Sequence, residues 1–213
     1  MQVRLSGARA LYAALRWTGA TEANPFADVR AARDPRAAWE KRGPYSAAEV
    51  DALLTHADPQ ERVVVLLAAD CGLRNSELTA LQRGDLYLDD EHPHVMVRGK
   101  GRAGYRQAVP LSRRTEHAIR VWLAGLPPDR PYLLTWRNRV TVRRHVVHLC
   151  ERAGVRYEGR EVHGLRHTAG TRTYAETGDI LEAKELLRHR DITSTQVYVH
   201  YARRGKKAAN REW

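Results

Sequence analysis

The stretch LLRHRDITSTQVYVHY, residues 186–201, places a histidine, His189, nine positions before a tyrosine, Tyr198. On one unbroken helix, nine steps of about 100° put two side chains on opposite faces. The residues between them predict a break, because Asp191 follows the apolar residues and TSTQ has the form of a capping box that starts a new helix. A turn between two helices would bring both side chains to one pocket, although a tyrosine on a short amphipathic helix more often belongs to the core.

The composition favours a protein that binds a polyanion. The chain has 213 residues, enough for one good-sized core and a small appendage, and a formal net charge of +11. That charge is typical of nucleic-acid binding, although a basic protein without such a partner has the same composition. The single Phe argues against a single-strand binder built on aromatic stacking.

Cysteine usage and hydropathy bear on the compartment. Cys71 and Cys150 are isolated and form no C-x-x-C pair, which favours structural burial in a reducing interior. No apolar run approaches 18 residues, and the first 20 residues lack a signal-peptide core. We therefore expect a cytoplasmic protein that spans no membrane.

Helical periodicity divides the chain into a first helix, a linker and a longer domain. Residues 4–18 have helical spacing, whereas 25–44 are charged, contain three prolines and lack periodicity. Ser46 opens a capping box and a helix that continues through Leu54. Further helices are predicted over 60–69, 113–124 and 140–153, and strands over Leu86–Leu88, Val95–Val97 and Gln107–Leu111.

Arg74 and Lys100 are candidate contacts for a phosphate. Asn75 or Ser76 can cap a short helix, which leaves Arg74 where the free N–H groups favour an anion. A plain salt bridge is the alternative. Lys100 lies at the tip of a predicted hairpin, where lysines are usually only solvated, and its GKG context lacks the other residues of a P-loop.

The segment EVHGLRHTAGT places His163 and Arg166 on one helical face. His163 and His167 also match H-x-x-x-H, so a zinc site has to be weighed. The metalloprotease form of that motif needs Glu after the first His, and Gly164 stands there. We therefore expect no metal.

Taken jointly, the contexts CGLRNSEL, GKGRAGYRQAVPL, HGLRHTAGT and LLRHRDITSTQVYVHY closely resemble the catalytic domain of tyrosine recombinases, the phage integrase family. The resemblance covers about residues 45–201. It implies that 1–24 are the last helix of an N-terminal core-binding domain, that 25–44 are the linker, and that 45–213 are the catalytic domain. The implied fold is α+β, mainly helical with a small three-stranded antiparallel sheet at one edge.

The resemblance also implies a reaction: site-specific recombination or integration, in which DNA strands are cleaved and rejoined through a 3′-phosphotyrosine intermediate. Tyr198 would be the nucleophile, and Arg74 and Arg166 would clamp the non-bridging oxygens of the phosphate. His189 would donate a further hydrogen bond, and His163 would assist the tyrosine proton. Because the cations are side chains, the reaction needs no metal, cofactor or ATP.

The remaining candidates support this set. The resemblance implies that Lys100 protonates the departing 5′-oxygen and that Glu77 holds the arginine or lysine in place. Arg188 stands where the family usually has glycine, and it either contacts phosphate or crowds the turn. Candidate contacts to DNA are Arg102, Arg143, Arg144 and Arg188.

The expected partner is double-stranded DNA, bound by a tetramer on two paired sites, with a monomer conceivable in free solution and a nucleoid-associated location. Two other functions remain open at this point. One is relaxation of DNA in the manner of a type IB topoisomerase, which shares the nucleophile and the arginines. The other is a DNA-binding module that uses the same fold without catalysis.

Overall fold

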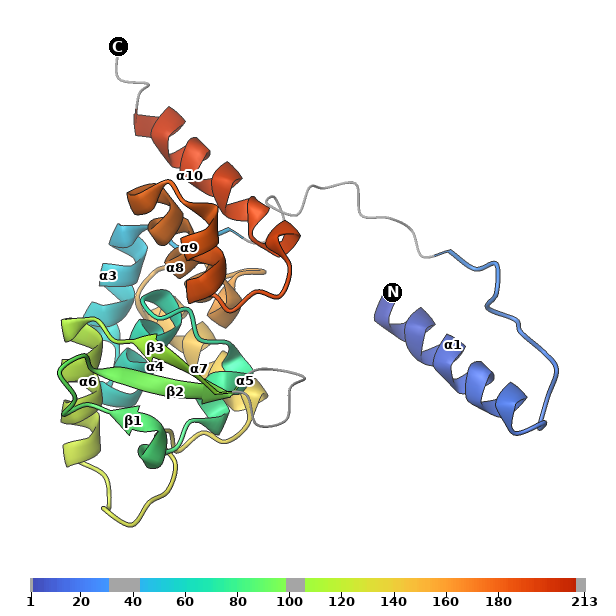
Figure 1. The fold of residues 1–213 in the computed structure, drawn as a ribbon, viewed down its shortest axis with the longest axis horizontal. Helices are drawn as coiled ribbons and strands as arrows, with labels where there is room; N and C mark the ends of the chain where they lie inside the picture. The colour runs from blue at the N-terminus through green and yellow to red at the C-terminus, as the bar shows by residue number, and fades with distance from the viewer. Residues whose placement is uncertain (1, 31–42, 99–105, 210–213) are drawn as a thin grey trace. The chain divides into compact units, whose positions relative to one another are not determined.

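The computed structural model describes residues 2–30, 43–98 and 106–209, with side chains from 4 to 203 within these ranges. The chain divides into two units, Met1–Ala37 and Ala38–Trp213, each of which is considered by itself (Figure 1). Within the described residues, no helix is long and apolar enough to cross a membrane.

The first unit contains helix α1, Gln2–Trp17, which confirms the helix predicted over 4–18. The chain after α1 folds back against it. Arg9 donates to the carbonyl oxygens of Phe26 and Val29, and the Phe26 ring packs edge-on against Tyr12 at 5.4 Å between ring centroids. That this helix belongs to a core-binding domain stays a prediction.

The second unit is mainly helical, with one small sheet, as predicted. Its helices are α3 (Ala47–His56), α4 (Pro59–Ala69), α5 (Asn75–Ala80), α6 (Arg113–Ala124), α7 (Arg139–Arg152), α8 (Glu161–Thr177), α9 (Ile180–Leu186) and α10 (Gln196–Ala209). Two short 3₁₀ turns, η1 (Arg83–Asp85) and η2 (Ile192–Ser194), complete the helical elements of the described residues. The capping box at Ser46 is confirmed, because its hydroxyl accepts from the Glu49 N–H while Glu49 accepts from the Ser46 N–H.

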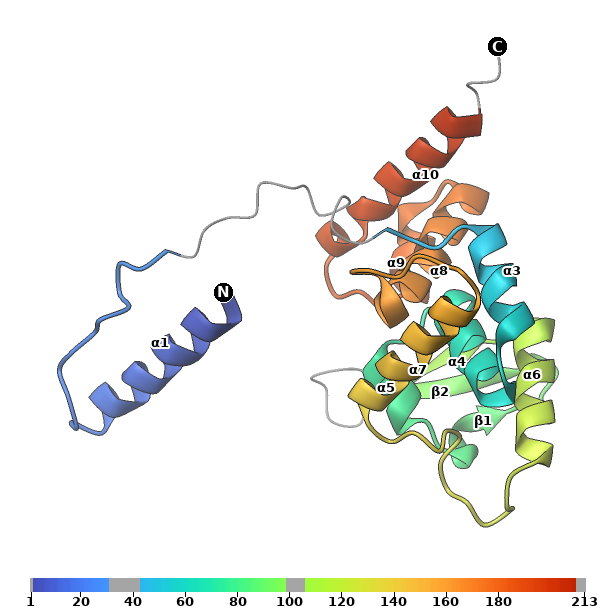
Figure 2. The same cartoon turned by 180° about the vertical axis from the view of Figure 1, so that it is seen from behind.

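The sheet is antiparallel with strand order β1-β2-β3, formed by Leu86–Tyr87, His94–Arg98 and Arg106–Pro110. Val95 pairs with Val109 in register, and both side chains are buried, as is Val97. The alternating burial of β2 shows why these runs form strands, since only one face of the sheet meets the core. In Figure 1 the sheet faces the viewer, whereas Figure 2, from behind, brings α7 to the front.

Helix α4 lies at the centre of the core. Every residue from Val63 to Ala69 is buried, and α4 packs against both α6 and α8. Such burial on all sides agrees with the apolar run that the sequence shows there. At its end, Asp70 accepts hydrogen bonds from Ser112 and Arg114 of the α6 end and from Arg172 of α8. One carboxylate therefore joins three helices.

This carboxylate gives a stability prediction. Burial alone would raise the pKa of Asp70, but the hydrogen bonds from Arg114, Arg172 and Ser112 lower it to about 2. A carboxylate whose pKa is lower folded than unfolded stabilises the fold above the unfolded pKa of about 3.8, and this contribution is lost as the pH falls towards 2. We expect Asp70→Asn to lower the free energy of unfolding at pH 7 by about 2 kcal/mol, a modest value because both arginines stay partly exposed and can turn to water.

Urea denaturation from pH 7 down to pH 2 measures this difference between wild type and variant, which should shrink below about pH 4. Asp89→Asn is the control, because Asp89 pairs with Arg120 at the surface and is 93% exposed. Its effect should stay below about 0.5 kcal/mol. An equal effect of the two substitutions would contradict the prediction.

The break expected between His189 and Tyr198 is present, but the predicted capping box is wrong. The turn η2 separates α9 from α10, and Asp191 is its N-cap, accepting hydrogen bonds from both the N–H and the hydroxyl of Thr193. The Thr193 side chain is thus a donor to Asp191 and caps nothing. A new helix, α10, follows as expected, but it begins at Gln196, whereas a cap at Thr193 would start it at Ser194.

Candidate active site

A cavity of about 500 Å³ brings together the ends of several helices. Residues from α5, α7, α8 and the turn after α9 line it: Leu73, Arg74, Asn75, Ser76, Arg139, Val140, Arg143, Glu161, Val162, His163, Arg166 and His189. Four of the six predicted catalytic side chains are in this lining, although Arg74 and His189 are 115 positions apart in the sequence.

Arg74 is the N-cap residue of α5, so the prediction that Asn75 or Ser76 caps this helix is wrong. The Glu77 carboxylate accepts from the Arg74 backbone N–H at 2.7 Å and from its guanidinium at 2.6 Å. The other end of the guanidinium donates to the carbonyl oxygens of Leu187 and Arg188, at 3.2 and 2.9 Å. Arg74 therefore makes the salt bridge of the alternative interpretation and lines the pocket as well, with its side chain 28% exposed.

Arg166, in the second turn of α8, is the largest fully buried side chain of the described residues. Its guanidinium donates to the carbonyl oxygens of Gly72 and Leu187. Gly72 has a left-handed backbone (φ +62°), which favours glycine, and a Cβ there would lie 2.6 Å from a methyl group of the Leu187 side chain. Burial, followed by the charges of Arg74 and Arg188, lowers the pKa of Arg166 to about 9, so that it is still a cation at neutral pH.

His189 lies in the turn after α9 and lines the pocket. Its Nδ1 is 3.0 Å from the hydroxyl of Thr195, which is fully buried. Burial, then Arg166 and Arg74, lowers the pKa of His189 to about 4, so the ring is neutral at pH 7. When Thr195 donates to Nδ1, the ring carries its proton on Nε2 and can donate one hydrogen bond to an anion.

Tyr198 is positioned by close packing of α10 on α8. Its side chain is buried, 1% exposed, and a Cβ on Gly170 would lie 2.9 Å from the ring carbon that bears the hydroxyl. The hydroxyl is 3.2 Å from Nδ1 of His167, and burial raises the pKa of Tyr198 to about 12. The rings of Tyr198 and His189 are stacked at 6.2 Å, yet Tyr198 is not among the residues that line the pocket. The expected convergence on one pocket therefore holds for His189 and not for the Tyr198 hydroxyl.

His163 and His167 connect the pocket with Tyr198. His163 is exposed and lines the cavity, and its ring meets that of His167 edge-on at 4.3 Å. His167 in turn contacts the Tyr198 hydroxyl. His167 and Thr195 are absent from the residues that sequence reasoning assigns to the site; the signal for His167 was its place one turn after His163. Among the described residues, no group of three His, Cys, Asp or Glu side chains could hold a metal ion.

The residues predicted to contact DNA differ in their exposure and in their contacts. Arg143 lines the pocket and pairs with Glu161 at 2.7 Å, and Arg144 is exposed on α7. Arg188 turns inward, with its side chain 5% exposed and paired with Glu77, so a contact with phosphate does not fit its position. Lys100 and Arg102 lie outside the described residues.

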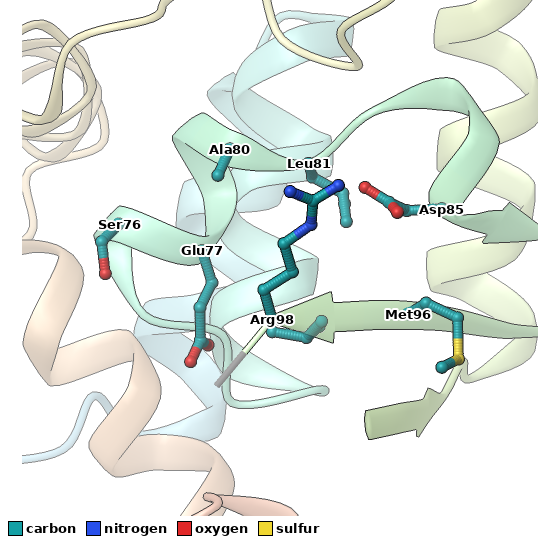
Figure 3. A pocket seen from close by; sticks show the side chains of 8 residues that line it. Ser76, Glu77, Ala80, Leu81, Asp85, Met96 and Arg98 are labelled. Carbon is teal, nitrogen blue, oxygen red and sulfur yellow. The ribbon is translucent and has the colours of Figure 1, made fainter. Parts of the chain in front are cut away.

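A second, smaller cavity of about 240 Å³ lies on the sheet side of α5. Figure 3 shows Glu77 reaching it from α5, and Arg98 from the end of β2, with the Arg98 guanidinium directed towards Leu81 and Asp85. Strand β2 therefore ends beside α5, the helix whose N-cap residue is Arg74. The Glu77 carboxylate lies in the wall of this cavity, while its oxygens bind Arg74 and Arg188.

Comparison with known proteins agrees with this arrangement. The model of the phage integrase family matches residues 45–204. Tyrosine recombinase XerC of Xanthomonas axonopodis pv. citri is 32% identical over 210 residues, covering 94% of this chain and 67% of that protein. Across similar tyrosine recombinases, this chain spans 50 to 67% of the length of the matched protein.

Solved structures share the fold. A lambda integrase (75–356) dimer bound to a COC′ core site superposes with a TM-score of 0.70 at 19% identity, over 98% of this chain and 73% of that one. The XerH site-specific recombinase bound to palindromic difH substrate, in a post-cleavage complex, gives a TM-score of 0.65 at 21% identity, over 80% of this chain and 53% of that one.

Proposed function

Because this chain belongs to the phage integrase family of tyrosine recombinases, we propose that it cleaves and rejoins duplex DNA through a covalent 3′-phosphotyrosine intermediate. The observation that carries the proposal is the convergence of Arg74, Arg166 and His189 on one pocket. Two guanidinium groups and a neutral imidazole suit the non-bridging oxygens of a phosphodiester, on which negative charge builds during attack. Each such preorganised donor contributes about 3–4 kcal/mol in comparable oxyanion sites.

The positions of the two arginines support a fixed clamp. Both are bonded to the carbonyl oxygen of Leu187, and Arg74 is held from the other side by Glu77. Side chains held in this way need little reorganisation when the phosphate arrives. A guanidinium has five N–H donors, so each arginine keeps donors for the phosphate beyond those already used.

Tyr198 has to change its environment before it reacts. Its buried hydroxyl, with a raised pKa, is bonded to His167 outside the pocket lining. Attack on phosphorus requires the hydroxyl to enter the pocket and lose its proton. The edge-on pair of His167 and His163 extends from that hydroxyl to the pocket, which supports the role of His163 in receiving the proton.

Lys100 remains the proposed general acid for the departing 5′-oxygen. What supports it is the described end of β2. Arg98, the last described residue of that strand, lines the small cavity together with Glu77, whose carboxylate binds Arg74. For contacts with the DNA backbone we propose Arg143 and Arg144 of α7, together with Arg102.

The test is covalent capture. The full chain is incubated with a pool of nicked duplexes of randomised sequence, in which the short strand after a cut diffuses away and traps the intermediate. We expect a protein–DNA adduct that survives denaturation, and sequencing its DNA gives the preferred site. The adduct should form equally in EDTA. Absence of an adduct across the whole pool would contradict the proposal.

The products separate the remaining alternatives. Exchange between two paired sites, with deleted or catenated circles, is the result expected of a recombinase that assembles as a tetramer on DNA. Relaxation of a supercoiled plasmid without exchange would identify topoisomerase-like activity. DNA binding without any adduct would identify a non-catalytic module.

A further inference from the structure

Arg188 has a backbone conformation that a non-glycine residue rarely adopts. Its φ is +53°, in the left-handed region, where a Cβ meets the following carbonyl oxygen. It directly precedes His189, and its carbonyl oxygen accepts a hydrogen bond from Arg74. A residue that keeps a side chain at such a position needs interactions that hold it there.

The structure contains such interactions. The Arg188 guanidinium is 2.8 Å from Oε2 of Glu77, and both side chains are only 5% exposed. It also donates to the carbonyl oxygens of Gly72 at 2.8 Å and Leu186 at 2.7 Å. Burying the charge of an arginine without partners is unfavourable, so the ion pair and the two backbone contacts are what keep the Arg188 side chain inside the protein.

The partners of Arg188 are shared with the two clamp arginines. Oε2 of Glu77 accepts from the Arg74 N–H as well, and Oε1 accepts from the Arg74 guanidinium. The carbonyl oxygen of Gly72 accepts from both Arg166 and Arg188. Unlike Arg74 and Arg166, Arg188 does not line the pocket, so a phosphate does not compete for its hydrogen bonds.

We propose that Arg188 is a positioning residue: it binds Glu77 and the Gly72 carbonyl from inside the protein and thereby fixes the His189 turn and Arg74 while phosphate engages the pocket. This rests on the function proposed above. Without Arg188, Glu77 would face Arg74 alone, and the turn would depend on donors from Arg74 and Arg166, the two groups that the phosphate needs. Glycine, which the family usually has at this position, adopts a left-handed backbone without strain. In this chain the ion pair between Arg188 and Glu77 stabilises that backbone conformation instead.

The experiment is a double-mutant cycle on the rate of adduct formation, in a single turnover at saturating concentrations of the captured duplex. Arg188→Met and Arg188→Gly should slow this step by up to about 100-fold, the loss typical of a misplaced active-site group, with little change in the Kd for DNA. Arg188→Lys keeps the charge beside Glu77 and should recover part of the rate. In a Glu77→Gln background, Arg188→Met should add less than about threefold, because the arginine acts through that carboxylate.

Arg188→Gly is the decisive variant. Glycine suits φ +53°, so Arg188→Gly removes the guanidinium contacts without adding backbone strain, and thermal denaturation beside the wild type checks that the variant is folded. Wild-type rates for Arg188→Gly, or fully additive effects with Glu77→Gln, would overturn the proposal. Arg156→Met is the matched control, since Arg156 is 84% exposed and pairs only with Glu158 among the described side chains.

A second readout needs no DNA. After burial, the charges of Arg166 and Arg74, then those of His163 and Arg188, lower the pKa of His189. In an NMR titration, His189 should therefore titrate at higher pH in Arg188→Met and Arg188→Gly, and closer to wild type in Arg188→Lys. If the wild type forms no adduct, the function proposed above fails and this titration alone decides on Arg188. An unchanged titration in all three variants would overturn the role of Arg188.

Discussion

Tyr198→Phe should eliminate the covalent adduct and leave folding and DNA binding nearly unchanged. Phenylalanine keeps the ring that packs against Gly170, Ala169 and Leu187, and it removes only the hydroxyl. The lost hydrogen bond to His167 is worth about 1 kcal/mol, too little to unfold the domain. Because no other atom can form the phosphodiester link to this side chain, adduct formation should fall below detection. Denaturing gel electrophoresis of the captured DNA measures this directly.

Two neighbouring tyrosines provide the controls. Tyr201 lies on the same helix with its ring 6.3 Å from that of Tyr198, and Tyr174 packs against the same cluster. Tyr201→Phe and Tyr174→Phe should both form adduct. If Tyr201→Phe lost the adduct while Tyr198→Phe kept it, the nucleophile would be Tyr201 and the assignment would be wrong.

The secondary structure was largely predictable, because its signals are local. The helix predicted over 113–124 begins and ends where α6 does, and all three strands are present within one or two residues. The errors concern which side chain caps a helix. Asn75 was a reasonable cap, but Arg74 takes the N-cap position because its N–H is bound by Glu77 from inside the helix. Asp191 and Thr193 both can cap, and the short 3₁₀ turn selects Asp191.

The site was predictable in its residue types and less so in its contacts. Arg74, His163, Arg166 and His189 meet in one pocket, as their sequence contexts indicated. The sequence does not show which distant group each side chain contacts. Arg166 binds the carbonyl oxygen of Gly72, 94 positions away, and Arg74 binds that of Arg188, 114 positions away. These contacts depend on how α8 and the His189 turn pack on the end of α4.

The same reason explains the two largest surprises. A Tyr198 hydroxyl bonded to His167 depends on the packing of α10 on α8 at Gly170, which no spacing rule encodes. An inward Arg188 depends on Glu77 being near enough to receive it. From sequence alone, an arginine of a basic protein is expected to face outward and contact DNA.

Arg166→Met should separate activity from stability. The arginine is buried between two other cations, and its pKa is lowered to about 9, first by burial and then by Arg74 and Arg188. A cation whose pKa is lower folded than unfolded destabilises the fold at every pH below about 9, and this penalty is relieved as the pH rises above that value. Its loss leaves no orphan acceptor, since Arg188 still binds the Gly72 carbonyl and Arg74 that of Leu187.

Methionine has a similar length and no charge, so we expect the free energy of unfolding at pH 7 to rise by about 1–3 kcal/mol. Adduct formation should fall by about 100- to 1,000-fold, the effect of removing one donor from a preorganised anion site. Thermal denaturation and the capture assay measure the two quantities on the same sample. Arg172→Met, on the same helix, is the matched control: it removes a partner of Asp70 and should lower stability without slowing the chemistry. A less stable Arg166→Met would mean that its hydrogen bonds outweigh the repulsion within the cluster. A stable and fully active Arg166→Met would remove Arg166 from the clamp, because a required cation cannot be replaced by a neutral thioether.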